Sequence, residues 1–370
     1  MNPWLVALAG AATAQLLASW RMTRKHRMRE PNAKCRVVEI RGSRGHHIAL
    51  YRFPPDRVTF REPVLLSHGL GANRFNLDFN DDGHGSPRLS LARYLHHHGF
   101  DVWMLETRGS GRAKVPWNAR WSLLDEARDD VGCALESVLS ESKVDRVFWV
   151  GHSKGGLLQL LHQALNLPTA RHVAGIVVVG TPGSAPAFNP LLRPMLRLAA
   201  GGISPGLPLI PIARLALPWA SPLTTVGRSL MPHLQGLPTP MMKKLFASLP
   251  SNVSPAVLSE LAKWTLEGRI VTEDGVPIEL THVSVPCLFI AGGRDWLAPL
   301  ESVRAGFEAI GSADKTFVEA GSESGVMYGH GGLLLGSNAP EDVFPVIRSW
   351  LSERACTLIA DPTASRPCVT

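Results

Sequence analysis

Short apolar runs that end at turn residues recur along most of the chain, with helix-like patterns between them. Several of these runs are apolar without alternation, as strands buried on both faces of a sheet must be. The expected strands are residues 63–69, 101–106, 146–151, 172–180, 286–293 and 315–321. Helical spacing of apolar positions separates them at residues 87–97, 121–142, 154–166, 298–310 and 341–353. Strands that alternate with helices predict an α/β fold with right-handed crossovers and a mostly parallel, doubly wound sheet.

Two segments depart from this alternation. Residues 36–53 alternate between apolar and polar and turn between Gly42 and Gly45, which predicts a β-hairpin. Residues 182–283 lie between two expected strands, although a crossover needs only about a dozen residues. The stretch from Pro182 to Pro250 holds 13 of the 29 prolines of the chain. Such proline density predicts short helices broken by turns, and we expect this insertion to form a Pro-rich cap between late strands.

An uncharged apolar stretch runs from Trp4 to Trp20, and cations follow it directly. As a helix it would span roughly 25 Å, slightly less than the hydrocarbon thickness of a bilayer, which is about 30 Å. Tryptophan at each end matches the aromatic belt of a membrane interface. The cations that follow, Arg21, Arg24, Lys25, Arg27 and Arg29, predict a single membrane anchor with the rest of the chain cytoplasmic. A cleaved signal peptide and a packed or amphipathic helix are the alternatives.

The net charge of +7 over 370 residues is concentrated next to apolar sequence. Besides residues 21–29, the segment 182–250 has no acidic residue and carries the cations Arg193, Arg197, Arg214, Arg228, Lys243 and Lys244. This placement favours an anionic membrane surface over nucleic acid as the partner. The five cysteines are scattered and form no CxxC pair, which excludes a disulfide scaffold. No metal or cofactor motif is present, so we expect neither.

The segment FWVGHSKGG at residues 148–156 matches the pattern G-x-S-x-G through Gly151, Ser153 and Gly155. It lies where an expected strand meets an expected helix. A nucleophile on such a strained turn needs small flanking residues, because larger side chains would collide there. Ser153 is therefore the candidate nucleophile, and the backbone amide of Lys154 begins the next helix. The Lys154 side chain either points to solvent or recognises an anionic acyl group.

With this motif and three others, the sequence resembles the α/β-hydrolase superfamily over residues 60–182 and 284–353. LLSHGLGANR at 65–74 is similar to the family's turn after the third strand, which implies that the amide of Leu70 donates to an oxyanion hole together with that of Lys154. We expect His68, beside this turn, to brace it.

Two later segments complete the resemblance. AGGRDWLAP at 291–299 is similar to the segment that carries the acid of a catalytic triad, which implies Asp295. MYGHGGLLLG at 327–336 resembles the loop of the catalytic histidine, which implies His330. The order Ser153, Asp295, His330 is the order of this superfamily. His152 is adjacent to the nucleophile and is not expected to fold back onto it.

The resemblance implies a serine hydrolase that cleaves carboxylic esters, of apolar or lipid-like acyl groups, through an acyl-enzyme. In detail the sequence resembles bacterial lipases and esterases and relatives of the polyhydroxyalkanoate synthases. Those synthases use cysteine as nucleophile, and position 153 is serine, which disfavours polymerase activity. An acyltransferase, a thioesterase and a cofactor-free haloperoxidase use the same triad and stay open. A catalytically inactive, membrane-associated binding protein is the alternative from another class.

The expected domains follow from these patterns. Residues 1–29 form the anchor and its basic segment. Residues 30–181 and 284–355 form the hydrolase core, and residues 182–283 form the cap. Residues 356–370 form a flexible tail. Oligomeric state cannot be inferred from the sequence.

Overall fold

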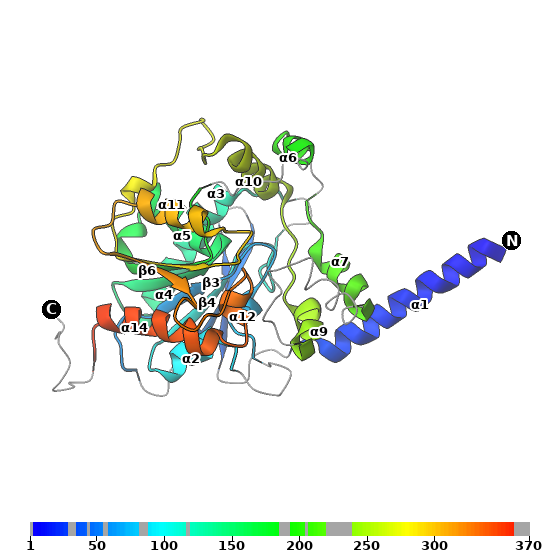
Figure 1. Cartoon of the computed structure of the whole chain (residues 1–370), viewed down its shortest axis with the longest axis horizontal. Helices are drawn as coiled ribbons and strands as arrows, with labels where there is room; N and C mark the ends of the chain where they lie inside the picture. The colour runs from blue at the N-terminus through cyan, green and yellow to red at the C-terminus, as the bar shows by residue number, and fades with distance from the viewer. Residues whose placement is uncertain are drawn as a thin grey trace.

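The structure is a computed structural model, and it describes residues 3–28, 35–42, 45–54, 58–80, 88–115, 119–184, 193–203, 206–219 and 239–358. In this part of the chain an eight-stranded sheet is flanked by helices on both faces (Figure 1). The strands are β1 (Arg36–Arg41), β2 (His47–Phe53), β3 (Val64–Ser67), β4 (Val102–Glu106), β5 (Val147–His152), β6 (Val173–Val179), β7 (Cys287–Gly292) and β8 (Lys315–Ala320). All the strands expected from the apolar runs are present.

The strand order in the sheet is β1-β2-β4-β3-β5-β6-β7-β8. The hairpin expected at residues 36–53 is present as the antiparallel pair β1–β2, with Arg36 opposite Arg52. β2 also pairs antiparallel with β4, and the remaining neighbours pair in parallel. The predicted hairpin and the predicted mostly parallel sheet are thus confirmed.

Two apolar cores lie on the two faces of this sheet. Successive residues of a strand point to opposite faces, so that Leu66 enters one core and Leu65 the other. The first core is covered by α2 (Leu91–His97), α12 (Gly332–Leu335) and α14 (Phe344–Arg354), with α13 (Ala339–Asp342) between the last two. The second is covered by α3 (Leu123–Asp125), α4 (Val131–Ser142), α5 (Lys154–Ala164) and α11 (Leu300–Ala309). A π-helical turn, Glu126–Asp130, joins α3 to α4.

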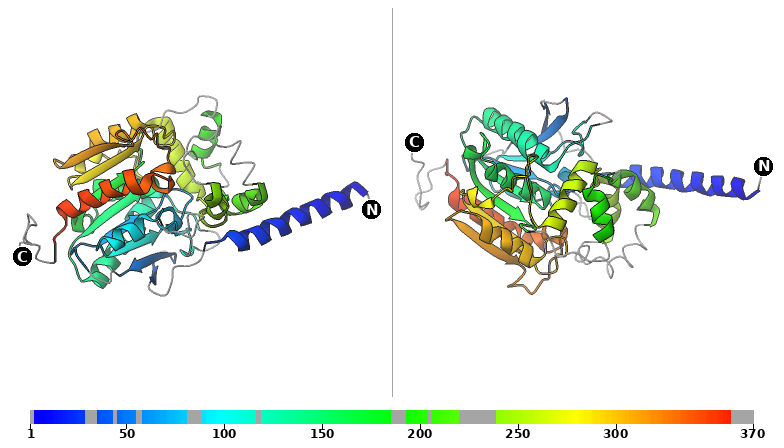
Figure 2. Two further views of the ribbon diagram at one scale, coloured as in Figure 1. Left: turned by 60° about the horizontal axis from the view of Figure 1, so that its bottom comes forward. Right: turned by 90° about the horizontal axis from the view of Figure 1, so that it is seen from above.

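Helices of 8 to 13 residues occupy the segment between β6 and β7 where the structure describes it. They are α6 (Arg193–Ala200), α7 (Leu209–Ala216), α9 (Thr239–Ser248) and α10 (Pro255–Glu267), with a 3₁₀ turn at Leu217–Trp219. In Figure 2 these helices lie together beside one end of the sheet. Arg228 lies outside the described residues, and the boundaries of the cap and of the other expected domains stay predictions.

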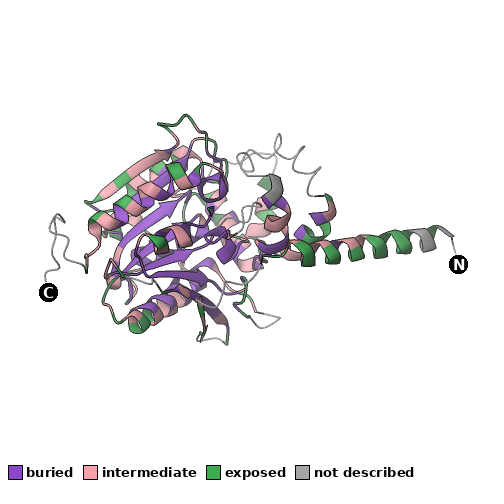
Figure 3. Cartoon of the chain, turned by 90° about the horizontal axis from the view of Figure 1, so that it is seen from below, coloured by how far each residue is buried: buried purple, intermediate pink, exposed green. Residues whose placement is uncertain are grey.

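The two ends of the chain differ in how they meet the body. The helix α1 (Pro3–His26) extends away from the body, with its C-terminal half against α7 and α9 (Figures 1 and 3). Among the described helices, none is long and apolar enough to cross a membrane. At the other end, the backbone of Thr357 pairs with Phe60, and Leu358 donates to the Thr59 carbonyl at 2.9 Å. Residues 356–358 of the expected tail therefore pair with residues 59–61, and residues 359–370 lie outside the described part.

Candidate active site

Ser153 occupies the sharp turn between β5 and α5 in a backbone conformation that residues with a side chain rarely adopt. Its φ is 53° and its ψ is −119°. The turn is held by hydrogen bonds at both ends: the Ser153 amide donates to the Val179 carbonyl at 2.9 Å, and the Gly156 amide donates to the Ser153 carbonyl at 3.0 Å. A Cβ added to Gly155 would lie 2.7 Å from the carbonyl carbon of Ser67. The glycine is therefore required by close approach of α5 to the end of β3.

His330 and Asp295 form a buried hydrogen-bonded pair beside this turn. Nδ1 of His330 lies 2.7 Å from Oδ2 of Asp295. Oδ1 of Asp295 accepts from the backbone amides of Leu297 and Ala298, both at 2.9 Å. Because these amides hold its other oxygen, the Asp295 carboxylate is fixed in place. It therefore orients the imidazole of His330 and favours the ring proton on Nδ1. Nε2 is then the ring nitrogen left to accept a proton.

Gly180, at the end of β6, is a component of the site that the sequence analysis did not identify. Its φ is +56°, and an added Cβ would lie 3.2 Å from Oδ2 of Asp295 and 3.4 Å from Nδ1 of His330. A side chain here would press directly on the histidine–aspartate pair. Local spacing carries no sign of this, because the contacts lie more than a hundred residues away in the chain.

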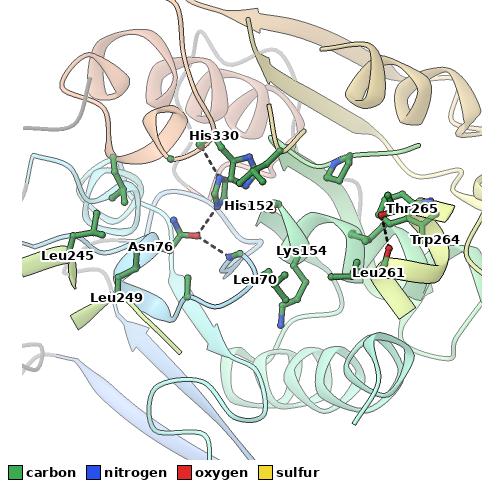
Figure 4. A pocket seen from close by; sticks show the side chains of 18 residues that line it. Leu70, Asn76, His152, Lys154, Leu245, Leu249, Leu261, Trp264, Thr265 and His330 are labelled. Carbon is green, nitrogen blue, oxygen red and sulfur yellow. Dashed lines mark hydrogen bonds between the residues drawn. The ribbon is translucent and has the colours of Figure 1, made fainter. Parts of the chain in front are cut away.

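Ser153, His330, Leu70 and Lys154 line one cavity of about 430 Å³ (Figure 4). Asp295 lies behind His330, so the structure brings all five predicted site residues together. Most of the remaining described lining is apolar, and it comes from the core and from the helices α9 and α10. Figure 4 shows Leu245 and Leu249 on one side of the site and Leu261 and Trp264 on the other. No carboxylate is among the described residues that line the cavity.

The Lys154 side chain follows neither of the two alternatives expected for it. It is 6% exposed, and its ammonium forms an ion pair with Glu126 and donates to Oγ1 of Thr107 at 3.1 Å. Trp121 donates to the other oxygen of Glu126 at 3.0 Å. The expectation of a solvent-pointing lysine is therefore wrong, and the charge that would recognise an anionic acyl group is already neutralised by Glu126. The ion pair instead ties the first residue of α5 to the π-helical turn.

Polar contacts of Asn76 and His152 link the turn of Leu70 to the loop of His330. Oδ1 of Asn76 accepts from the amide of Gly69 at 3.0 Å and lies 2.9 Å from Nδ1 of His152. Nε2 of His152 lies 3.2 Å from the carbonyl oxygen of His330. Burial lowers the pKa of His152 to about 3, so its ring is neutral near pH 7 and donates through one nitrogen only, to the Asn76 oxygen or to the His330 carbonyl. His152 and Asn76 therefore connect the turn of Leu70 to the loop of His330, a contact that the sequence analysis missed.

His68 lies next to the same turn, with Nδ1 2.9 Å from the Gly69 carbonyl oxygen. Burial lowers its pKa to about 3 as well, with a further contribution from the charge of Lys154. A neutral, buried imidazole at this place agrees with a bracing role. Within the described residues, no group of three or more His, Cys, Asp or Glu side chains could hold a metal ion.

Comparison with known proteins places this geometry among hydrolases. The chain is 33% identical to triacylglycerol lipase 1 of Arabidopsis thaliana over 40% of its own length and 37% of the lipase. It is 22% identical to the poly(3-hydroxyalkanoate) polymerase subunit of Haloferax mediterranei, over 80% of its own length and 59% of that subunit. The chain thus spans less than two thirds of either relative.

A thermophilic esterase from Thermogutta terrifontis shares the fold, with a TM-score of 0.55 and 20% identity over 86% of this chain and 99% of the esterase. At that identity the likeness concerns the fold alone. The sequence profile of a hydrolase family, described as serine aminopeptidase, S33, matches residues 84–320, which is more than half of the chain. The chain therefore belongs to this family of α/β-hydrolases.

Proposed function

We propose that the chain is a serine hydrolase that cleaves carboxylic esters of apolar acyl groups through an acyl-enzyme. One observation carries the proposal. Ser153 on its strained turn and the His330–Asp295 pair meet at a cavity that is lined mostly by apolar side chains. The similarity to triacylglycerol lipase 1 supports the same class of reaction.

In the proposed reaction, the hydroxyl oxygen of Ser153 attacks the ester carbonyl while Nε2 of His330 takes its proton. Asp295 holds the ring and stabilises the imidazolium that forms. When the tetrahedral intermediate collapses, the bond to the alcohol breaks and His330 returns the proton to the departing oxygen. Water then attacks the acyl-enzyme by the same route, which releases the acid and restores the serine.

The negative oxygen of each tetrahedral intermediate would be held by the backbone amides of Leu70 and Lys154. A donor of this kind typically contributes about 3–4 kcal/mol to the stability of the transition state. The amide of Lys154 stands at the N-terminus of α5, where the helix dipole also favours a negative charge. The Glu126 ion pair and the Asn76–His152 contact would keep the two donors in place.

The cavity supports an apolar acyl group better than the amino-terminus of a peptide, although the family name refers to an aminopeptidase. An aminopeptidase needs a partner for the charged α-amino group of its substrate, and carboxylates supply it most directly. The described residues that line the cavity include no carboxylate, but they include leucine and tryptophan side chains. Burial of each methylene of an acyl chain there would contribute about 0.8 kcal/mol.

A fluorophosphonate probe tests the nucleophile directly. We expect it to label Ser153 and to stop hydrolysis of p-nitrophenyl esters. Ser153→Ala should lose the label and about 10⁴-fold or more in kcat while the fold is retained. Ser137→Ala is the matched control, because its hydroxyl donates to a carbonyl within α4 and lies outside the described cavity lining. Activity retained by Ser153→Ala would overturn the assignment.

The same protein separates the alternatives. Comparing p-nitrophenyl esters with acyl-CoA substrates, with and without an alcohol acceptor, distinguishes ester hydrolysis from thioesterase and acyltransferase activity. Peroxide-dependent halogenation tests the haloperoxidase alternative. A chain that neither reacts with the probe nor turns over any of these substrates would support the inactive binding protein.

A further inference from the structure

The N-terminal half of α1 is an apolar helix that the rest of the described protein does not cover. Residues 8–14 are exposed at every position around the helix. Leu8 is 66% exposed, and Leu16, about two turns nearer the body, is 60% exposed. No charged residue occurs between Pro3 and Trp20. A helix that is apolar on all sides is ordinarily buried. We therefore expect this half of α1 to contact an apolar environment outside the described protein.

The C-terminal half of α1 is attached to the body by specific contacts. The side-chain amide of Gln15 donates to the Leu215 carbonyl, which follows Arg214 in α7, at 2.8 Å. The backbone amide of Met28 donates to the hydroxyl of Ser248 at the end of α9, at 2.7 Å. Met22 packs against Leu217 and Ala247. The direction in which the apolar half projects is therefore set by the fold (Figure 2).

Cations surround the base of the projecting half. On α1, α7 and α9 these are Arg21, Arg24, Lys25, Arg214, Lys243 and Lys244, and the three helices contain no acidic residue. The pKa of His26 is lowered by burial and then by the charges of Lys243, Lys25 and Lys244, which agrees with these cations lying close together. Exposed apolar side chains continue from α1 over this region at Ile212 and Trp219.

The basal surface consists of the apolar half of α1, the exposed side chains of Ile212 and Trp219, and the cations Arg21, Arg24, Lys25, Arg214, Lys243 and Lys244. We propose that this surface binds an anionic lipid bilayer. The apolar half of α1 inserts among the lipids, and the cations meet the negatively charged headgroups. The positive charge of the basal surface favours a bilayer over a second copy of this chain as its partner. In a two-fold symmetric contact the patch meets itself, which would bring like charges together in an apolar interface.

The basal surface is also joined to the cavity. α9 packs against α1, and Leu245 near its end and Leu249 just after it line the cavity. Binding of α1 to a bilayer would therefore place the cavity wall next to the lipids, from which an apolar ester could enter. This consequence rests on the proposed ester hydrolase, whereas bilayer binding does not.

Flotation of the full chain with vesicles tests the proposal without any need for activity. The chain should float with phosphatidylcholine vesicles that contain 30% phosphatidylglycerol, and the affinity should fall as salt rises. At about 1 kcal/mol per cation near the surface, the loss of two positive charges in Lys243→Glu with Lys244→Glu should weaken binding by about 30-fold or more. Lys263→Glu with Arg269→Glu is the matched control, since these exposed cations lie on and just after α10.

A second pair of variants tests insertion rather than charge. Leu8→Asp with Leu16→Asp should abolish flotation, while Val58→Asp with Val276→Asp, also exposed apolar positions, should leave it unchanged. Circular dichroism checks that each variant is folded. Turnover of soluble p-nitrophenyl acetate should be the same for both pairs, so a failure of the proposed reaction is seen separately from a failure to bind.

Three results would overturn the proposal. One is equal binding to neutral and anionic vesicles at low salt, and another is an equal loss in the matched controls. The third is a dimer in solution that Leu8→Asp with Leu16→Asp dissociates, in a chain that does not float with vesicles. That result would assign the basal surface to a second copy.

Discussion

Replacing Glu126 by glutamine should destabilise the protein far more than the same change at an exposed ion pair. The side chains of Lys154 and Glu126 are 6% and 3% exposed, so both charges lie outside water. In Glu126→Gln the Thr107 hydroxyl, at 3.1 Å, stays available to the ammonium, and the single amide oxygen can accept from the ammonium or from Trp121, but the positive charge loses its counter-charge. Leaving a buried charge uncompensated costs about 3–5 kcal/mol of folding free energy.

The pair of Arg36 and Glu141 supplies the control. Its side chains are 57% and 35% exposed, and it likewise joins a glutamate to a basic side chain, but at the surface. Exposed pairs contribute about 0–1 kcal/mol, so Glu141→Gln should change the free energy of unfolding by no more than that. The measurement is urea unfolding followed by tryptophan fluorescence, with the free energy obtained by linear extrapolation.

A double variant shows whether the loss comes from the unpaired charge. Lys154→Met with Glu126→Gln removes both charges, and the glutamine oxygen can still accept from Trp121. Most of the stability should return. Turnover of a soluble ester should stay within about tenfold of the native value, because the proposed reaction uses the amide of Lys154 and not its ammonium.

Two outcomes would refute this reasoning. If Glu126→Gln loses no more stability than Glu141→Gln, the buried pair does not hold the turn as described. If Lys154→Met folds with native stability but loses activity, the ammonium acts on the substrate.

Three further changes probe the site and its support. Asp295→Asn should lower kcat by about 10⁴-fold with little loss of stability, since the amide presents the wrong partner to Nδ1 of His330; steady-state kinetics measures this, and native activity would point to another acid. Gly155→Ala should destabilise the protein by about 1–3 kcal/mol or more, because its methyl meets the Ser67 carbonyl at the end of β3; urea unfolding checks it, and a neutral effect would contradict the close approach. Burial raises the pKa of Glu260 to about 7, so its protonated form stabilises the fold below about pH 4.5, and this contribution is lost as pH rises through 7. The melting temperature of the native chain relative to Glu260→Gln should therefore fall between pH 5 and pH 8, and a constant difference would count against the shift.

The sequence alone determined the elements of the core and the identity of the candidate triad. Strands such as residues 146–151 are recognisable because burial on both faces leaves a local apolar run. Ser153 is recognisable because a strained turn excludes side chains from its immediate neighbours. Asp295 and His330 follow from their motifs and from chain order, since each motif describes a short segment with its own turn.

Other features depended on the tertiary structure, because their partners lie far apart in the chain. The ion pair of Lys154 joins residues 28 positions apart, and the contact of Asn76 with His152 joins residues 76 positions apart. Spacing along the sequence carries no signal of such contacts, so neither of the two placements expected for the Lys154 side chain included an ion pair with Glu126.

The N-terminal helix shows the same division. Its apolar residues and the cations after them are plain in the sequence, and they indicated a membrane partner. Its packing against α7 and α9 depends on the tertiary structure, because Gln15 contacts a carbonyl 200 residues away in the chain. Local sequence patterns indicate whether a residue will be buried. Which distant residue buries it depends on the tertiary structure. In this protein the tertiary structure packs the apolar helix against α9, which also lines the cavity of the candidate active site.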